Sequence, residues 1–508
     1  MPVVFFSFLA ILDQRFCCFV LFKNTNVLQQ WNLHLIVSGK SVIIRRDNFD
    51  RIFTKIGVVE MKVAKFGGSS LASGEQLKKV FEIVVSDPER KIVVVSAPGK
   101  RNSDDIKVTD LLIEAAEQQL RGDNGEHLIE DVVSRYASIA EELNISESVV
   151  TGIHENLMAL LHADQTNPKR YLDTLKASGE DNNAKLVAGY FQSLGVEAQY
   201  INPKKAGLIV TDEGGFTKVL PESYDRLYAL RDEPGIIVFP GFFGYTLDGD
   251  VLTFSRSGSD ITGSILANGV KADLYENFTD VDAVYAVNPN VVSNPKGIRE
   301  LTYREMRELS YAGFSVFHDE ALIPAFRAGI PVHIQNTNNP AAQGTRIVST
   351  RDNTNGPVIG IASDKGFCSI YISKYLMNRE VGFGRKLLHI LEDYGVSYEH
   401  IPSGIDDVTL ILRQDQMKGE AEKKIISRIK KELHADEVNV EHDLALIMVV
   451  GEGMRHNVGT TARASKALAE AKVNIEMINQ GSSEVSMMFG VKGHNEETAI
   501  QALYHEFF

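Results

Sequence analysis

The chain has 508 residues, of which 44% are hydrophobic and 24% charged, a composition typical of a soluble globular protein and not of a disordered or fibrous one. Its length predicts about three or four domains, and its formal net charge of −14 argues against nucleic acid or an anionic membrane as the main partner. There are three cysteines, two of them adjacent, which excludes a disulfide framework or a zinc site and favours a reducing, cytoplasmic setting.

Residues 1–60 differ from the rest of the chain. They contain the only tryptophan, Trp31, and a Phe-rich start. Asp13 interrupts the first apolar run before it reaches the roughly 18 residues of a membrane span, and no basic segment precedes that run as in a signal peptide. We expect an extension that is either disordered or upstream of a true start at Met61, where a strand begins at once.

From residue 61 to about residue 355, apolar strands alternate with helical segments. The run Lys-Ile-Val-Val-Val-Ser at 91–96 is typical of a strand buried on both faces. A helix is expected at 74–85, and residues 110–195 read as mostly helical. Further strands are expected at 63–66, 198–201, 236–239, 272–276 and 331–335. Strands separated by helices predict an α/β fold with a largely parallel sheet.

The pattern changes after about residue 355. Residues 352–357 read as a linker. Two similar stretches follow, at 368–412 and 444–490, each in the order strand, loop, helix, strand, strand. We interpret them as a duplicated small α+β unit, and two unrelated α+β segments are the alternative.

The segment Lys-Phe-Gly-Gly-Ser-Ser starts at Lys65, where a strand ends and a helix is about to begin. Glycines permit close backbone approach, and the N–H groups of a helix start together with a lysine favour an anion. A plain turn with a solvated lysine is the alternative.

Three other polar segments are candidates for binding. Arg256 lies in a turn before a predicted helix at 261–268 and is suited to grip a carboxylate, or else is a surface residue beside a helix cap. Glu180 precedes a predicted helix at 183–193, where a favourable first-turn charge is the preferred reading. Asp280 and Asp282 follow a strand and suit Mg²⁺, a ribose or a turn.

Taken in order, these motifs resemble aspartate kinases of the amino-acid kinase family, from Met61 to the C-terminus. The resemblance implies a three-layer αβα sandwich with a sheet of about eight strands, followed by two ferredoxin-like ACT domains. The implied domains are an extension at 1–60, a catalytic domain at 61–355 and a regulatory region at 356–508, with ACT units at about 362–435 and 440–508.

The resemblance also implies an activity. ATP, with Mg²⁺, would phosphorylate the β-carboxylate of L-aspartate to give 4-phospho-L-aspartate, the first step towards lysine, threonine and methionine through the diaminopimelate pathway. Lysine, alone or with threonine, would be the allosteric effector. The protein would be a cytoplasmic homodimer paired through its ACT domains, without a metal site of its own and without nucleic-acid or membrane partners.

The resemblance implies roles for the residues that match the family's motifs. The catalytic residues would be Lys65, Arg256 and Asp260. ATP would be bound by Lys65, Phe66, Gly67, Gly68, Thr279, Asp280 and Tyr285, and aspartate by Thr109, Glu180, Arg256, Ser257, Gly258 and Ser259. The effector region matches Met377, Glu399 and Ser403, where Glu399 would hold an amino group or else be a solvated surface glutamate.

Some positions depart from the family pattern. Ser257 stands where the family often has glycine, and Asn290 and Ser315 replace an arginine and a lysine. The last two changes remove cations near the nucleotide, so they bear on ATP affinity and not on the reaction class. The alternatives are another amino-acid kinase, acting on glutamate or N-acetylglutamate, and an amino-acid sensor with a decayed kinase domain.

Overall fold

The computed structural model describes residues 32–37, 40–45, 60–255, 257–314, 320–352, 356–481 and 484–508. The chain divides into two compact units, Met1–Glu60 and Met61–Phe508. In the first unit, β1 (Asn32–Val37) pairs antiparallel with β2 (Lys40–Arg45). The other expectations for residues 1–60 lie outside the described residues. No helix of the described ranges is long and apolar enough to cross a membrane.

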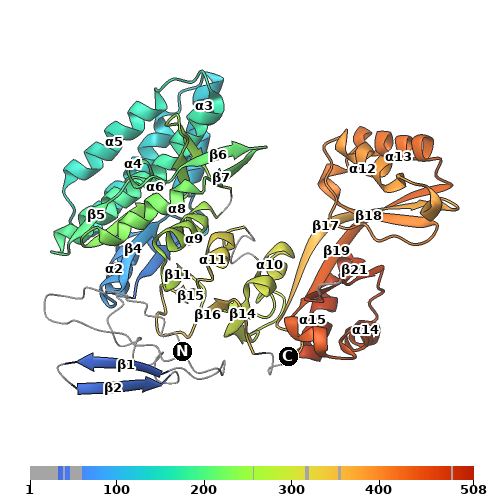
Figure 1. Ribbon diagram of the computed structural model, residues 1–508. Helices are drawn as coiled ribbons and strands as arrows, with labels where there is room; N and C mark the ends of the chain where they lie inside the picture. Colours follow the sequence, from blue (N-terminus) through green and yellow to red (C-terminus); the bar gives the residue numbers. More distant parts are fainter. Residues whose placement is uncertain are drawn as a thin grey trace, which may run out of the picture. The chain divides into compact units, whose positions relative to one another are not determined.

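An eight-stranded sheet organises the N-terminal part of the second unit (Figure 1). Its order is β14-β16-β15-β11-β3-β4-β8-β5, and the strands from β15 to β5 are all parallel. β16 runs antiparallel to β15 and parallel to β14. The strands are β3 (Lys62–Phe66), β4 (Arg90–Val95), β5 (Ala198–Tyr200), β8 (Ile236–Pro240), β11 (Leu274–Thr279), β14 (Glu300–Thr302), β15 (Val332–Asn336) and β16 (Thr345–Val348). The prediction of a largely parallel sheet is confirmed.

Helices cover both faces of this sheet. Successive strand residues point to opposite faces, so Ala64 packs with one group of helices and Val63 with the other. The first group is α2 (Gly74–Val85), α3 (Val108–Arg121), α4 (Glu126–Glu142), α5 (Glu147–Leu161) and α6 (Pro168–Ser193). The second is α8 (Glu222–Leu227), α9 (Gly258–Val270), α10 (Tyr303–Tyr311) and α11 (Ile323–Ala328).

Shorter elements connect these layers. They are η1 (Gly68–Leu71), α7 (Pro203–Ala206), β6 (Val210–Glu213), β7 (Phe216–Val219), η2 (Tyr228–Asp232), β9 (Phe243–Tyr245), β10 (Val251–Thr253), β12 (Val284–Tyr285) and β13 (Gly297–Ile298).

Helix α6 corrects one expectation. The turn expected before a helix at 183 is wrong, because α6 is one helix of 26 residues from Pro168 to Ser193. Asn167 accepts a hydrogen bond from the Arg170 N–H, and Pro168 occupies the first turn, so both start signals stand well upstream. Gly179 in its middle is a packing requirement, because a Cβ there would lie 3.0 Å from the Ala97 Cβ.

The C-terminal part has one five-stranded antiparallel sheet in the order β18-β17-β19-β21-β20. Its strands are β17 (Gly360–Ser373), β18 (Asp407–Arg413), β19 (Glu437–Val450), β20 (Met477–Asn479) and β21 (Ser486–Lys492). Its helices are η3 (Met377–Arg379), α12 (Phe383–Glu392), η4 (Gln414–Gln416), α13 (Glu420–Leu433), η5 (Glu452–His456), α14 (Thr460–Glu470), η6 (Gly493–Asn495) and α15 (Glu496–Phe507).

β17 and β19, of 14 residues each, run through both repeats of this sheet. α12 and α13 share one core with the later half of β17, and α14 and α15 share another with the later half of β19. The duplicated α+β unit is therefore present, with a second helix in each repeat that the sequence pattern did not include. In the first repeat, the order strand, loop, helix, strand, strand requires a strand at 396–401 after the helix, and this expectation is wrong. Within that segment, His400 makes only a single bridge to Ile411 of β18.

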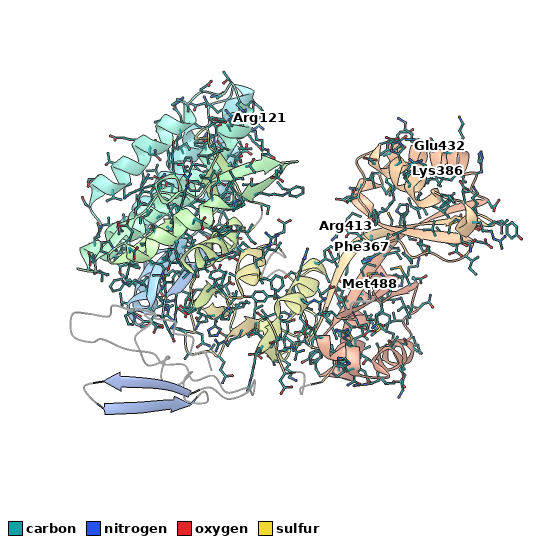
Figure 2. The ribbon with its side chains drawn as sticks, viewed as in Figure 1. Arg121, Phe367, Lys386, Arg413, Glu432 and Met488 are labelled. Atoms are coloured by element: carbon teal, nitrogen blue, oxygen red, sulfur yellow. The ribbon has the colours of Figure 1, made fainter. Side chains whose placement is uncertain are left out.

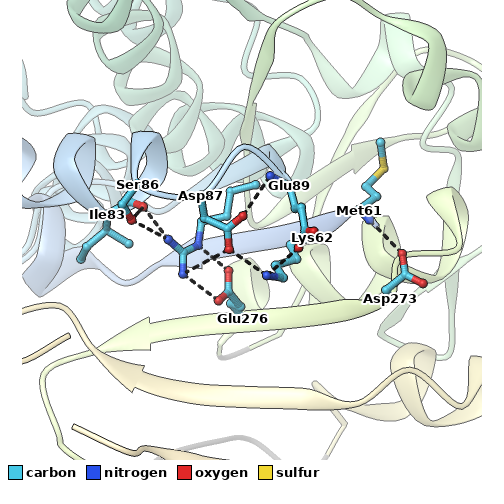
Figure 3. Close-up of polar contacts among 9 residues, drawn as sticks. Met61, Lys62, Ile83, Ser86, Asp87, Glu89, Asp273 and Glu276 are labelled. Atoms are coloured by element: carbon cyan, nitrogen blue, oxygen red, sulfur yellow. Dashed lines mark hydrogen bonds and ion pairs between the residues drawn. The ribbon is translucent and has the colours of Figure 1, made fainter. Parts of the chain in front are cut away.

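A buried ion pair ties β4 to β11 across the sheet (Figure 3). The Arg90 guanidinium donates from Nε and Nη2 to the two carboxylate oxygens of Glu276, at 2.7 and 2.9 Å. Its Nη1 also donates to the carbonyl of Ile83 at the end of α2. Glu276 is 3% exposed, and Arg90 is the cation that hydrogen-bonds to its carboxylate.

We expect Glu276→Leu to lower the free energy of unfolding by about 3–5 kcal/mol, because Arg90 would lose its close counter-charge and keep only the 4.0 Å contact with Asp87. The double variant Arg90→Met/Glu276→Leu should recover most of this loss, since it removes both charges. Urea unfolding followed by circular dichroism measures the effect.

Glu75→Gln is the matched control, because the pair of Glu75 with Lys79 is exposed and should be worth less than about 1 kcal/mol. A double variant no more stable than Glu276→Leu alone would contradict this account of the pair.

Candidate active site

The ends of four parallel strands meet at one edge of the sheet. β3, β4, β8 and β11 run in the same direction, so the residues that follow them share the carboxyl edge. The N–H of Gly67 donates to the Phe278 carbonyl at 3.1 Å, and the N–H of Gly99 to the Gly68 carbonyl at 2.8 Å. Ligands of open α/β sheets bind at this edge, in the crevice outside the strand ends.

Glycines let the loops after β3 and β4 touch backbone to backbone. A Cβ on Gly99 would lie 2.5 Å from the carbonyl carbon of Gly68, and one on Gly68 would lie 3.1 Å from the Ala97 carbonyl oxygen. The sequence assigned Gly68 to anion binding alone. The structure gives it a packing reason as well, because any side chain would push the two loops apart.

Lys65 is held in a buried polar cluster and is not solvated. Its Nζ lies 2.5 Å from Oδ1 of Asp260, in the first turn of α9, and both residues are less than 10% exposed. Asn277 is the register partner of Lys65 on β11, and its Nδ2 donates to the same Asp260 oxygen at 2.6 Å. The Tyr275 hydroxyl donates to the backbone carbonyl of Asp260 at 3.1 Å. The anionic partner and its supports therefore fix Lys65 at the strand end.

The start of α9 lies directly against the loop after β8. A Cβ on Gly241 would lie 2.5 Å from the Ser259 Oγ. Ser257 precedes α9 with φ of 59°, in the left-handed region that favours glycine. Serine there carries backbone strain that the glycine usual in the family avoids. Gly258 opens α9, and Arg256 lies outside the described residues.

Glu180 lies in the middle of α6, so the first-turn surface charge preferred from the sequence is wrong. The residue is 5% exposed, and burial raises the pKa of its carboxyl to about 8 although the Ala97 N–H hydrogen-bonds to it. Its Oε2 has no hydrogen-bond partner among the described residues. A buried acceptor without a donor marks a place for a ligand. Thr109 borders the same loop, since the N–H of Val108 donates to the Pro98 carbonyl at 3.3 Å.

The candidate nucleotide residues follow β11. Asp280 is exposed, and the Thr279 hydroxyl donates to it at 3.2 Å. Asp282 instead shapes a turn, because the side-chain amide of Asn336 donates to it at 2.7 Å. Tyr285 is half-buried in β12.

Phe66, Asn290 and Ser315 are also positions that the sequence places near the nucleotide. The Phe66 ring is fully buried on the face opposite Lys65 and stacks on Phe278 at 4.7 Å, so only its backbone can reach a ligand. Asn290 is exposed, and Ser315 lies outside the described residues.

The described ranges hold no group of three or more His, Cys, Asp or Glu suited to a metal. Asp280 alone fits a magnesium ion that arrives with phosphates, since Mg²⁺ is usually held by one or two carboxylates plus substrate oxygens.

The expected effector residues do not form one open site. Met377 is buried in the core of the first repeat, and Ser403 is exposed. Glu399 is not a solvated glutamate: its carboxylate accepts a hydrogen bond from the Tyr311 hydroxyl and lies 3.4 Å from Nε of Arg413. Arg413 also stacks over the Phe367 ring and pairs with Asp364 at 2.7 Å (Figure 2). The hydrogen bond between Tyr311 and Glu399 therefore links the end of α10 to the first repeat.

Sequence reasoning missed Asn277, Asn183 and Tyr311. Asn277 could have been found as the polar residue inside an otherwise apolar strand. Asn183 stands one helical turn after Glu180, a spacing that becomes visible only when α6 is known to be continuous. No local signal marks Tyr311, because its partner lies 88 residues away.

The raised pKa of Glu180 makes a prediction about stability. Between about pH 4.5 and about pH 8 the unfolded chain ionises this carboxyl while the folded protein keeps it protonated, so its contribution to stability is lost as pH rises through this window. Glutamine does not titrate. We expect Glu180→Gln to raise the ligand-free unfolding midpoint over wild type by an amount that grows with pH, reaching on the order of a few degrees at pH 8. A calorimetric pH series measures this, and a pH-independent difference would refute it.

Comparisons with known proteins agree with this geometry. Residues 60–336 match the amino acid kinase family, and residues 447–507 match an ACT domain. Aspartokinase 3 of Bacillus subtilis is 72% identical over 448 residues, which cover 88% of this chain and 99% of that protein.

Solved structures give the same result. The aspartate kinase of Clostridium acetobutylicum has 39% identity and a TM-score of 0.78, over 88% of this chain and all of that one. Escherichia coli aspartokinase III in complex with aspartate and ADP has 26% identity and a TM-score of 0.72, over 88% and 100% of the two chains. The same enzyme in complex with lysine and aspartate has 25% identity and a TM-score of 0.69, over 88% and 99%. The chain therefore belongs to the aspartokinases of the amino acid kinase family.

Proposed function

We propose that this protein transfers the γ-phosphoryl group of ATP to the β-carboxylate of L-aspartate, giving 4-phospho-L-aspartate and ADP. The observation that carries the proposal is the buried Lys65–Asp260 pair at the carboxyl edge of the sheet, where the loop after β3 packs against the loop after β4. Glu180, with its partnerless carboxyl oxygen, contacts that second loop at Ala97. The complex of the E. coli relative with aspartate and ADP supports the choice of ligands.

The phosphoryl transfer needs no strong general base. A carboxylate is already ionised near pH 7, so the difficulty lies in bringing it up to an anionic phosphate. Lys65 would neutralise charge on the transferring group. Its side chain needs little reorganisation, because Asp260 and Asn277 already fix it. Mg²⁺ bound with the nucleotide would supply further charge neutralisation, and Asp280 is the residue suited to hold it.

Recognition of aspartate would use the middle of α6 and the start of α9. Glu180 would pair with the ammonium group, which an N-acetylated substrate lacks. Arg256 would grip the α-carboxylate, with Ser259 and Thr109 nearby. N-acetylglutamate is therefore expected to be a poor substrate. The product would enter lysine, threonine and methionine synthesis.

We expect Lys65→Ala to reduce kcat for aspartate by about a hundredfold or more, because one preorganised cation at a transferring phosphoryl group is worth this much. The control is Lys62→Ala on the same strand, whose ion pairs with Asp87 and Glu89 lie away from the site; its kcat should stay within about twofold.

A coupled ADP-release assay measures both variants, with aspartate, glutamate and N-acetylglutamate as acceptors. Lys65→Ala activity within about threefold of wild type would refute the role of Lys65. Wild-type protein that releases no ADP with any acceptor would favour the decayed-kinase sensor instead.

We further propose a catalytic domain at 61–355 and a regulatory region at 356–508 that senses lysine, alone or with threonine, in a cytoplasmic homodimer paired through the ACT domains. The lysine complex of the E. coli relative supports the effector. The contact between Tyr311 at the end of α10 and Glu399 of the first repeat is the route by which an effector would reach the kinase. A bound amino group that pairs with the Glu399 carboxylate would weaken the hydrogen bond that Glu399 accepts from the Tyr311 hydroxyl.

We expect Tyr311→Phe to weaken lysine inhibition, raising the half-inhibitory concentration about fivefold or more, as a coupling of roughly 1 kcal/mol would require. Tyr375→Phe is the control, since that ring is exposed on the first repeat. Dose–response curves with lysine and threonine measure the effect, and an unchanged curve for Tyr311→Phe would contradict the proposed route.

A further inference from the structure

Asn183 shares a helix face with Glu180. The two residues stand three positions apart on α6, so their side chains leave the helix on the same side. Both reach consecutive residues of the loop after β4: the Asn183 Nδ2 donates to the Ser96 carbonyl at 2.6 Å, and the Ala97 N–H hydrogen-bonds to the Glu180 carboxyl. Asn183 is fully buried.

The Ser96 contact fixes which way the Asn183 amide faces. A carbonyl oxygen only accepts hydrogen bonds, so the NH₂ group must point at Ser96 and the amide oxygen must point away. That oxygen, Oδ1, is buried and has no hydrogen-bond partner among the described residues. Rotating the amide would place two acceptors against each other, so the protein cannot satisfy Oδ1 by a flip.

The helix face therefore carries two buried acceptors without donors, Asn183 Oδ1 and Glu180 Oε2. Native proteins seldom leave buried polar groups without partners, because each such group loses its hydrogen bond to water and gains none in return. An apolar ligand group would leave both acceptors without donors. A group with several N–H donors would satisfy both at once, and a primary ammonium offers three.

We infer that Asn183 is a specificity-determining residue of the aspartate site, its Oδ1 accepting a hydrogen bond from the substrate ammonium beside Glu180. The inference rests on the proposed function for the identity of the ligand. The two residues would have different roles. The substrate ammonium would draw Glu180 into its charged form and pair with it, while Asn183 supplies a second, directed acceptor and anchors the loop after β4 through Ser96.

The test compares aspartate with succinate, the same dicarboxylate without the ammonium group. Calorimetric titration of the full chain gives the Kd of each ligand for wild type and for Asn183→Ala. We expect the Kd for aspartate to rise about tenfold or more, as loss of a hydrogen bond to a charged group requires, and the Kd for succinate to stay within about twofold. In steady-state assays the KM for aspartate should rise while the KM for ATP stays unchanged.

Asn182→Ala is the matched control, because Asn182 is the adjacent buried asparagine of the same helix and faces another direction. It should leave the aspartate-to-succinate ratio of Kd values unchanged. Asn183→Ser, smaller and still polar, is the second variant should alanine prevent folding, and it should shift the ratio in the same direction.

Equal weakening of both ligands would show that Asn183 only positions the Ser96 loop and would overturn the inference. An unchanged ratio in both Asn183 variants would overturn it too. Wild-type protein that neither binds nor phosphorylates aspartate would instead refute the proposed function, so the two failures are distinguishable.

Discussion

The ion pair between Lys65 and Asp260 is the constraint on which the site depends. Taking two charges out of water costs several kcal/mol per ion, and only close geometry with further hydrogen bonds repays it. Asn277 and Tyr275 supply those bonds from the neighbouring strand. The pair forms because parallel pairing of β3 with β11 sets Lys65 beside Asn277 and because α9 begins above that point. A slip of one residue in this register would turn Lys65 towards the opposite, apolar face.

The site gathers segments that are distant in sequence through close backbone packing. Gly68 lies against Gly99 and Gly241 lies against Ser259, so the ends of three strands and the start of α9 converge within contact distance. α6 completes the site from the other face of the sheet by bringing Glu180 and Asn183 to the loop after β4. This local arrangement of cation, backbone and paired acceptors suits an anionic metabolite with an amino group, even though the whole chain is strongly acidic.

The two long strands of the C-terminal sheet connect its two repeats. β17 and β19 each belong to both repeats and pair along most of their length, with the register shifting on either side of Phe367. A displacement in one repeat would therefore reach the other through these two strands. The first repeat touches the catalytic part at Tyr311 and Glu399, and the second at Ser486, whose hydroxyl donates to Glu308 at 2.8 Å. Both contacts fall on α10, so this helix joins the C-terminal sheet to the N-terminal part.

The sequence by itself determined the features that depend on neighbouring residues. The apolar run at 91–96 gave a doubly buried strand, and α2 spans Gly74–Val85 as expected because Ser73 caps it by accepting from the Gln76 N–H. Motif order located the turn after Lys65 and the helix start at Asp260. Tertiary structure alone decided that Lys65 is buried, that the Phe66 ring faces away from the site, that Glu399 is bound to Tyr311 and that Asn183 stands with Glu180. Each of these depends on contacts between residues tens to hundreds of positions apart, whose free energy is gained only when strand register and helix packing have fixed the chain.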